Sequence, residues 1–238
     1  MKIYRRKLCY LLTLFILVVS VSGCTNSVRL ERHTAEFLNL FDTVTEIIAY
    51  TDTKETFTDE AQFFHDELKK YHELYDIYNN YEGINNIKTI NDNAGIQPVK
   101  VDQKIIDLLL LGGELFDKTD GKINLAFGSV LSIWHEYREQ GIDDPQNAKI
   151  PSMEELEEAL QYTDFKKVII DEEKSTVYLE DPNMRLDVGA LAKGYAVEQV
   201  CRTAEEKGYM PVLVSDAGHV TSIGDTPVRA FRQFGIQH

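Results

Sequence analysis

The spacing of apolar residues along the chain predicts several helices. Residues 59–78 repeat apolar side chains at steps of three and four, which is the period of an amphipathic helix. The same period runs from a candidate cap at Asp102 to about residue 118, after which Thr119-Asp120-Gly121 end the helix. Ser152 and Glu155 form a capping box for a short helix that ends at residue 161. Further helical patterns cover residues 127–140 and 190–207.

Shorter apolar runs predict strands between these helices. They cover residues 44–50, 168–171, 176–179, 185–188 and 211–215. The second and third runs flank a polar turn at residues 172–174, which predicts a hairpin. Residues 79–95 are rich in Asn and Gly and predict a loop rather than one regular element. Helices and strands are mixed without a regular alternation, so the predicted fold class is α+β.

The first 23 residues have the pattern of an export signal. Four basic residues precede an apolar run over residues 8–19, which is shorter than a membrane span. Val21-Ser22-Gly23-Cys24 then resembles a lipobox, in which the signal is cut before Cys24 and Cys24 carries acyl chains (palmitate among them). A membrane helix is the alternative, and the short run and the small residues before Cys24 argue against it.

The expected organisation follows from that signal. We predict a lipoprotein signal peptide over residues 1–23, a polar tether over residues 24–33 and one domain over residues 34–238. The lipid supplies membrane affinity rather than a fold. The predicted location is the extracytoplasmic face of the cell membrane.

Charge and cysteine content narrow the possible partners. The formal net charge is -14, and because the expected signal is basic the rest of the chain is more acidic still. Such a surface repels phosphate backbones, so we expect no nucleic-acid partner. With Cys24 lipidated and Cys9 removed with the signal, Cys201 has no partner for a disulfide and reads as a small buried side chain.

Residues 186–196 are the most informative stretch of the domain. Asp187 ends an apolar run, Gly189 allows a turn, and a helix with small residues follows. Free N–H groups at a helix start favour an anion, and Lys193 lies one turn further on. Asp187 is also a candidate hydrogen-bond acceptor for a ligand. The alternative is a helix cap and turn without a ligand.

Several motifs in order together resemble the ApbE family of flavin transferases, the FAD:protein FMN transferases. The strongest match is Leu-Asp-Val-Gly-Ala-Leu-Ala-Lys-Gly-Tyr-Ala at residues 186–196. Weaker matches are Phe41-Asp42-Thr43, the loop that ends in Ile90-Asn91, the block from Gly121-Lys122-Ile123-Asn124 to Ser129-Val130-Leu131 and Trp134, and residues 212–224.

This resemblance implies an ApbE-like (T-fold-like) mixed sheet with packed helices. It also implies an enzyme that binds FAD and Mg²⁺, transfers the FMN moiety to a Thr or Ser hydroxyl of a partner flavoprotein, and releases AMP. That partner is expected to be a subunit of a membrane redox complex. Such phosphoryl transfer depends on positioning and charge neutralisation.

Site residues follow by position from the family's motifs. The resemblance assigns flavin or adenine contacts to Phe41, Tyr78, Lys122, Ile123 and Asn124, and FAD contacts to Asp187 and Lys193. It assigns the backbone oxygen of Ala190 to Mg²⁺, an ion that prefers oxygen ligands. Asn124 stands where the family usually has Asp.

The end of the chain changes what the resemblance implies. The family continues beyond a Gly-Ile-Gln stretch through a His…Asp-x-x-Thr-Gly segment, which carries catalytic and metal-binding side chains. Here that segment does not follow His238, so the catalytic residues are unknown and the domain is expected to be incomplete at its C-terminus. Two alternatives stay open: a flavin-binding or FAD-hydrolysing lipoprotein, and an extracytoplasmic solute-binding lipoprotein.

Overall fold

The computed structural model describes residues 30–41, 43–209, 212–216 and 219–223 of the chain. The predicted signal peptide, the lipidation site Cys24 and the segment before His238 lie outside these residues. None of the described helices is long and apolar enough to cross a membrane.

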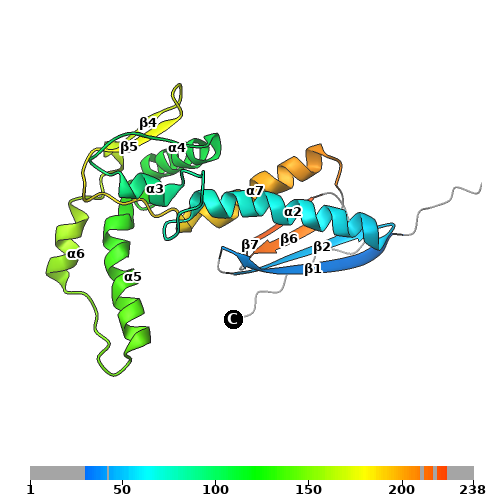
Figure 1. Cartoon of the computed structure of the whole chain (residues 1–238), viewed down its shortest axis with the longest axis horizontal. Helices are drawn as coiled ribbons and strands as arrows, with labels where there is room; N and C mark the ends of the chain where they lie inside the picture. Colours follow the sequence, from blue (N-terminus) through cyan, green and yellow to red (C-terminus); the bar gives the residue numbers. More distant parts are fainter. Residues whose placement is uncertain (1–29, 42, 210–211, 217–218, 224–238) are drawn as a thin grey trace, which may run out of the picture.

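One part of the molecule is a four-stranded antiparallel sheet with two long helices on one face (Figure 1). Its strands are β1 (Glu31–Leu40), β2 (Thr43–Thr51), β6 (Val212–Asp216) and β7 (His219–Ile223), in the order β1-β2-β6-β7. Helices α2 (Lys54–Tyr75) and α7 (Gly189–Glu206) pack on the sheet and against each other. Residues Thr45, Ile47, Ala49 and Thr51 of β2 alternate toward this core, as expected for a strand with one buried face.

The other part combines a small sheet with shorter helices (Figure 1). The strands β3 (Val99–Lys100), β5 (Thr176–Leu179) and β4 (Val168–Asp171) form an antiparallel sheet in that order. Around it lie α3 (Ile87–Asp92) and α4 (Gln103–Lys118), together with the short 3-10 helices η1 (Leu125–Phe127) and η2 (Phe165–Lys167). Helices α5 (Gly128–Asp143) and α6 (Met153–Leu160) project as an arm.

The mixed architecture confirms the predicted α+β class, and local capping signals account for several helix boundaries. Asp102 accepts a hydrogen bond from Lys104 N–H at the start of α4, and Ser152 and Glu155 form the predicted capping box of α6. The helix predicted over residues 59–78 begins earlier, because Thr53 caps α2 by accepting from Thr56 N–H.

The strand predicted at residues 185–188 is wrong, because these residues belong to no strand of the described structure. The amide of Asn91 on α3 takes the place of a neighbouring strand. Its Nδ2 donates to Leu186 O at 3.0 Å, and its Oδ1 accepts from Leu186 N–H at 2.7 Å. A side chain 95 positions away therefore satisfies the backbone that leads to Asp187.

Three strands were not predicted: β1, the two-residue β3 and β7. Strand β1 begins at Glu31, inside the expected tether, and pairs along β2 from the register Glu31–Thr51 onward. His219 is the first residue of β7 and pairs with Asp216 in the ladder.

Candidate functional site

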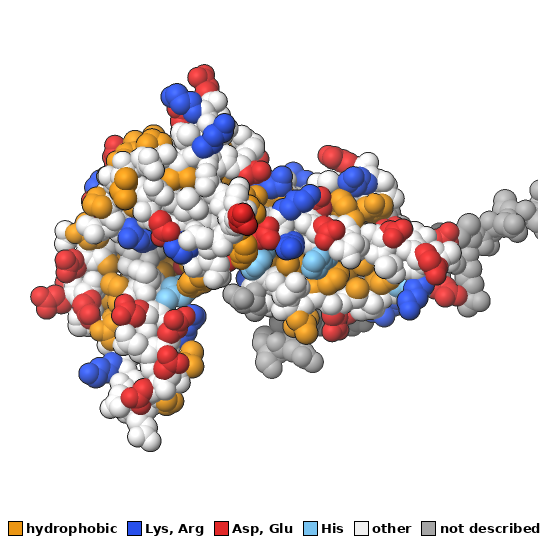
Figure 2. All heavy atoms as spheres, viewed as in Figure 1, with side chains coloured by type: hydrophobic (Ala, Val, Ile, Leu, Met, Phe, Trp, Pro, Cys, Tyr) orange, Lys and Arg blue, Asp and Glu red, His pale blue; other side chains and the backbone are white. Residues whose placement is uncertain are grey.

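A cavity of about 280 Å³ lies where the C-terminal end of α2, the start of α7 and the side of α5 meet. Figure 2 shows the surface hollowed where the arm of α5 and α6 joins the part that holds α2. The lining residues with aromatic or titratable side chains include Phe41, His72, Asp76, Tyr78, His135, Asp187 and Lys193. A second hollow of about 350 Å³ shares Ile77, Tyr78, His135 and Asp187 with it. We call the first cavity the α2–α7 pocket.

Hydrogen bonds fix the backbone at Asp187 and at the residue before it. The preceding residue, Leu186, is tied to Asn91, and Asp187 N–H donates to Leu125 O at 2.9 Å. The Asp187 side chain then accepts from Gly189 N–H at 2.9 Å through Oδ1. This bond uses one free N–H of the first turn of α7 and aims the carboxylate into the pocket.

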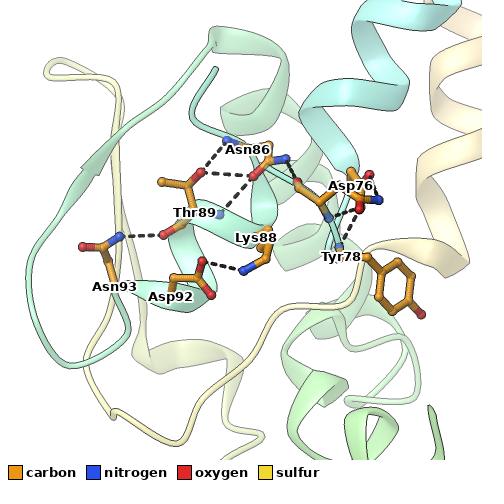
Figure 3. Close-up of polar contacts among 8 residues, drawn as sticks. Asp76, Tyr78, Asn86, Lys88, Thr89, Asp92 and Asn93 are labelled. Atoms are coloured by element: carbon orange, nitrogen blue, oxygen red, sulfur yellow. Dashed lines mark hydrogen bonds and ion pairs between the residues drawn. The ribbon is translucent and has the colours of Figure 1, made fainter. Parts of the chain in front are cut away.

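Tyr78 stands on a loop that two polar side chains hold (Figure 3). Asp76 Oδ1 accepts from the N–H groups of Tyr78 and Asn79 at 2.6 and 3.0 Å, which ends α2 in an Asx-type turn. Asn86, which is fully buried, donates to Asn79 O at 2.8 Å and caps α3. The phenol ring of Tyr78 points away from these bonds.

The same bonds make the Asp76 carboxyl a stronger acid. Burial acts to raise the pKa of Asp76, but hydrogen bonds from Asn79, Tyr78 and Tyr81 favour the ionised form and hold its pKa below the ordinary range. Tyr81 contributes the hydroxyl bond, at 2.7 Å to Oδ2. Asp76 is therefore a fixed negative group that stabilises the loop.

His135 joins Tyr78 to Asp187. The hydroxyl of Tyr78 lies 2.8 Å from His135 Nδ1, and His135 Nε2 lies 3.4 Å from Asp187 Oδ2. Burial and the negative charge of Asp187 raise the pKa of the Tyr78 phenol, so its hydroxyl keeps its proton.

Gly128 sets the distance between α5 and the segment before α7. A Cβ at this position would lie 2.5 Å from Arg185 O and 2.8 Å from Leu186 C, so a glycine is needed for the two backbones to approach. This close packing places His135, two turns further along α5, beside Asp187.

Phe41 has the left-handed backbone conformation that bulky residues seldom adopt. Its φ is 52°, its N–H donates to His72 Nδ1 at 3.2 Å, and its ring meets the His72 ring edge to face. Such a conformation persists only where the surroundings enforce it, and it concentrates at functional sites. Here it turns the chain between β1 and β2 at the wall of the pocket.

The structure brings together four of the residues that the sequence assigned to FAD: Phe41, Tyr78, Asp187 and Lys193 all line the α2–α7 pocket. Ala190, assigned to Mg²⁺, lies exposed in the first turn of α7 between the lining residues Gly189 and Ala192.

The assigned residues Lys122, Ile123 and Asn124 are not among the residues that line this pocket. They belong to the turn between α4 and η1. Asn124 caps η1 by accepting from Ala126 N–H at 2.9 Å, and it donates to Thr163 O at 2.8 Å. In the described part of the chain its bonds therefore support the fold.

Two histidines of the pocket had no place in the sequence-based site. The sequence assigned no site role to His135, whose ring bridges two site residues. His72 supports Phe41. The Asn and Gly content of residues 79–95 predicted a loop after Tyr78, but nothing local indicated which helix would face it.

The described residues do not form a complete metal site. Within residues 30–41, 43–209, 212–216 and 219–223, no group of three or more His, Cys, Asp or Glu side chains is placed to hold a metal ion. The backbone oxygen predicted at Ala190 would need further ligands. The groups that line the pocket are two carboxylates (Asp76 and Asp187), one lysine, two imidazoles and aromatic rings, which offer hydrogen bonds and apolar faces to a ligand with a planar ring.

Comparison with solved structures agrees with this architecture. The crystal structure of the ApbE protein of Thermotoga maritima superposes with a TM-score of 0.68 at 24% identity, over 82% of this chain and 60% of that chain. The flavin transferase ApbE of Vibrio cholerae superposes with a TM-score of 0.65 at 16% identity, over 82% and 60%. These likenesses define the fold.

Sequence comparison then identifies the family. The model of the ApbE family matches residues 41–238, and the chain belongs to that family. A FAD:protein FMN transferase of Klebsiella pneumoniae (strain 342) is 27% identical over 148 residues, which are 62% of this chain and 45% of that protein. One of Treponema pallidum (strain Nichols) is 29% identical over 143 residues, which are 58% and 38%. The chain spans less than half the length of these curated relatives.

Proposed function

We propose that this chain binds FAD in the α2–α7 pocket and serves the transfer of its FMN moiety to a Thr or Ser hydroxyl of a partner flavoprotein. The observation that carries the proposal is the convergence of Phe41, Tyr78, Asp187 and Lys193 on one cavity in a chain of the ApbE family. Relatives in the family bear the name FAD:protein FMN transferase.

The proposed reaction exchanges one phosphate ester for another. The acceptor oxygen bonds to the phosphorus of the FMN half, the bond from that phosphorus to the bridging oxygen breaks, and AMP leaves with that oxygen. The hydroxyl proton passes to solvent. Catalysis of this kind depends on holding the pyrophosphate and offsetting its charge.

The described residues can contribute binding and orientation to that reaction. Lys193 and the N-terminal end of α7 place positive charge at the pocket, where they would attract the pyrophosphate. The rings of Phe41 and Tyr78 offer apolar faces to a planar flavin or adenine. The fixed carboxylate of Asp187 would accept a hydrogen bond from a ligand N–H or O–H group.

Mg²⁺ belongs to the proposal as a requirement of transfer. The ion would offset pyrophosphate charge, and Ala190 is the candidate for a backbone ligand. The described residues do not complete a magnesium site. The binding and orientation roles proposed above are therefore those of side chains that would contact FAD directly.

The proposal also includes a lipid anchor that places the domain near its acceptor flavoprotein. An acyl chain on Cys24 would hold the domain at the extracytoplasmic face of the membrane, where a membrane redox complex subunit could present its hydroxyl. Labelling with radioactive palmitate tests the anchor: the full chain should incorporate label and the Cys24→Ala variant should not. Equal labelling of both would refute lipidation at Cys24.

The activity test uses the full chain in mild detergent with FAD, Mg²⁺ and membrane proteins of the cells that produce it. We expect a protein band with ultraviolet flavin fluorescence in a denaturing gel, a mass gain of FMN on a Thr or Ser, and release of AMP. Release of FMN and AMP without a labelled protein would favour the FAD-hydrolysing alternative. Absence of FAD binding would overturn the proposal and favour a solute-binding protein.

Variants test whether the pocket is the FAD site. Asp187→Ala and Lys193→Ala should each weaken FAD binding about tenfold or more, because each removes a charged hydrogen-bonding group. Lys207→Ala is the matched control, since Lys207 lies at the other end of the same helix region, over the Phe63 ring. If the Lys193 and Lys207 variants bind FAD equally well, the placement of the site is wrong.

A further inference from the structure

The imidazole of His135 is the contribution of α5 to the pocket. It comes from a different part of the molecule than its two partners: Tyr78 follows α2, 57 positions earlier, and Asp187 precedes α7, 52 positions later. The Tyr78 and His135 rings meet at 73° with their centroids 5.7 Å apart. One side chain thus connects three segments at the place where the two hollows share a wall.

The chemistry of the three groups determines the direction of both bonds. An ionised Asp187 can only accept, so the contact at 3.4 Å requires a hydrogen on His135 Nε2. In the neutral imidazole Nδ1 is then an acceptor, and the hydroxyl of Tyr78 donates to it at 2.8 Å. In this neutral tautomer His135 donates through Nε2 and accepts at Nδ1, the nitrogen nearer to the Tyr78 hydroxyl, which lies 3.5 Å from Nε2.

The Asp187 carboxylate is consequently held at both oxygens. Gly189 N–H fixes Oδ1 at 2.9 Å, and His135 faces Oδ2. The side chains of His135 and Asp187 are 27% and 11% exposed, so water can compete for these contacts only in part. Removing the imidazole would free the carboxylate to rotate and would free the phenol of Tyr78.

We propose that His135 is a positioning residue for FAD: it does not react, but it holds Asp187 as an oriented acceptor and Tyr78 as an oriented aromatic wall before the ligand arrives. This inference rests on the proposed function. Groups that are already ordered lose less conformational entropy when the ligand binds, so orientation of both residues increases affinity.

Three substitutions separate the two contacts. His135→Leu removes both. His135→Gln can place an amide N–H near the position of Nε2 and retain the contact with Asp187, whereas His135→Asn can place an oxygen near Nδ1 and retain the contact with Tyr78. FAD affinity is measured by isothermal titration of the full chain in mild detergent, with thermal unfolding of each variant as the measure of folding.

We expect His135→Leu to bind FAD about tenfold more weakly and the Gln and Asn variants to recover part of that loss, as is typical of one or two oriented hydrogen bonds. In a Tyr78→Phe background the recovery by His135→Asn should disappear, because the hydroxyl that it accepts from is gone. The recovery by His135→Gln should persist. A purely structural role of His135 would not produce this selectivity.

The control is His65→Gln, which makes the same change on α2 away from both hollows, where His65 meets Asp66 and the Phe37 ring. It should bind FAD as the unaltered chain does. If the unaltered chain binds FAD and His135→Leu, folded by its unfolding curve, binds within about twofold of it, the inference is overturned while the proposed function stands. If the unaltered chain does not bind FAD, the proposed function fails and this inference fails with it.

Should His135→Leu not fold, the FAD affinities of the His135→Gln and His135→Asn variants test the positioning role instead. If His135→Asn binds FAD more weakly and His135→Gln does not, the contact with Asp187 accounts for the affinity. If only His135→Gln binds more weakly, the contact with Tyr78 accounts for it. Either result supports a positioning role. Equal, unimpaired affinity in both variants, with and without the hydroxyl of Tyr78, would overturn it.

Discussion

Replacing Asn91 with alanine would test whether one buried amide holds the segment that carries Asp187. The amide makes two hydrogen bonds to the Leu186 peptide, at 3.0 and 2.7 Å. Asn91 is 8% exposed and Leu186 is 1% exposed, so after the substitution water reaches the vacated N–H and C=O groups poorly. Each unsatisfied buried group costs about 1–3 kcal/mol, which gives a loss of about 2–6 kcal/mol in the free energy of unfolding.

The lower end of that range applies where water enters the space left by the amide. A loss of about 3 kcal/mol corresponds to a fall in Tm of about 6–12 °C for a domain of this size. Urea unfolding followed by circular dichroism measures the free energy directly. FAD affinity should fall as well, because Asp187 follows Leu186 immediately and loses its fixed position.

Two further variants make the test specific. Asn91→Asp keeps the oxygen that accepts from Leu186 N–H but opposes a carboxylate to Leu186 O, so it should also destabilise the fold. Asn93→Ala is the control, because the Asn93 side chain makes only local contacts at the end of α3: it donates to Thr89 O and accepts from Gln97 Nε2, so its loss should cost about 1 kcal/mol or less. If Asn91→Ala destabilises the protein no more than Asn93→Ala does, the reasoning about Leu186 is refuted.

Three other predictions follow from the structure. Gly128→Ala should lower stability by about 1–3 kcal/mol and weaken FAD binding, since its Cβ would lie 2.5 Å from Arg185 O; an unchanged thermal unfolding curve would contradict the close approach. Because the pKa of Asp76 is lowered in the folded protein, its stabilisation is present above the ordinary pKa of 3.8 and is lost as the pH falls through the folded value. Tyr81→Phe removes the hydroxyl that donates to Asp76, so the variant should lose less stability on acidification than the unaltered chain does. An equal loss in both, measured by unfolding at several pH values, would argue against the hydrogen bond between Tyr81 and Asp76. Burial raises the pKa of Cys201 to about 12, so iodoacetamide at about pH 8 should label it only after unfolding; prompt labelling of the native chain at Cys201, located by peptide mass spectrometry, would be inconsistent with burial.

The helices with local start signals were the part of the fold that could be predicted. Asp102 and Ser152 cap their own first turns, so the information lies within three residues of each boundary. The hairpin of β4 and β5 was likewise predicted from its two apolar runs and the turn between them.

Features that depend on contacts between residues far apart in the sequence could not be predicted from local patterns. Residues 185–188 have the composition of a strand, yet a side-chain amide from α3 occupies the hydrogen bonds that a strand would use. Phe41, Tyr78, Asp187 and Lys193 were found through resemblance to a family, and the structure brings them to one pocket. His135 was missed because the helical period tells which way a residue faces but not what it meets.

The bond between Asn91 and Leu186 also bears on the order in which the molecule takes shape. Ribosomes add roughly 5–20 residues per second, so a span of 95 residues separates the two partners by about 5–20 s of synthesis. Until Leu186 is made, the amide of Asn91 has only water or transient contacts, and neither Asp187 nor α7 exists to form the pocket. The faces of α2 and α4 that contact α7 in the folded protein therefore have no α7 to pack against until this interval has passed.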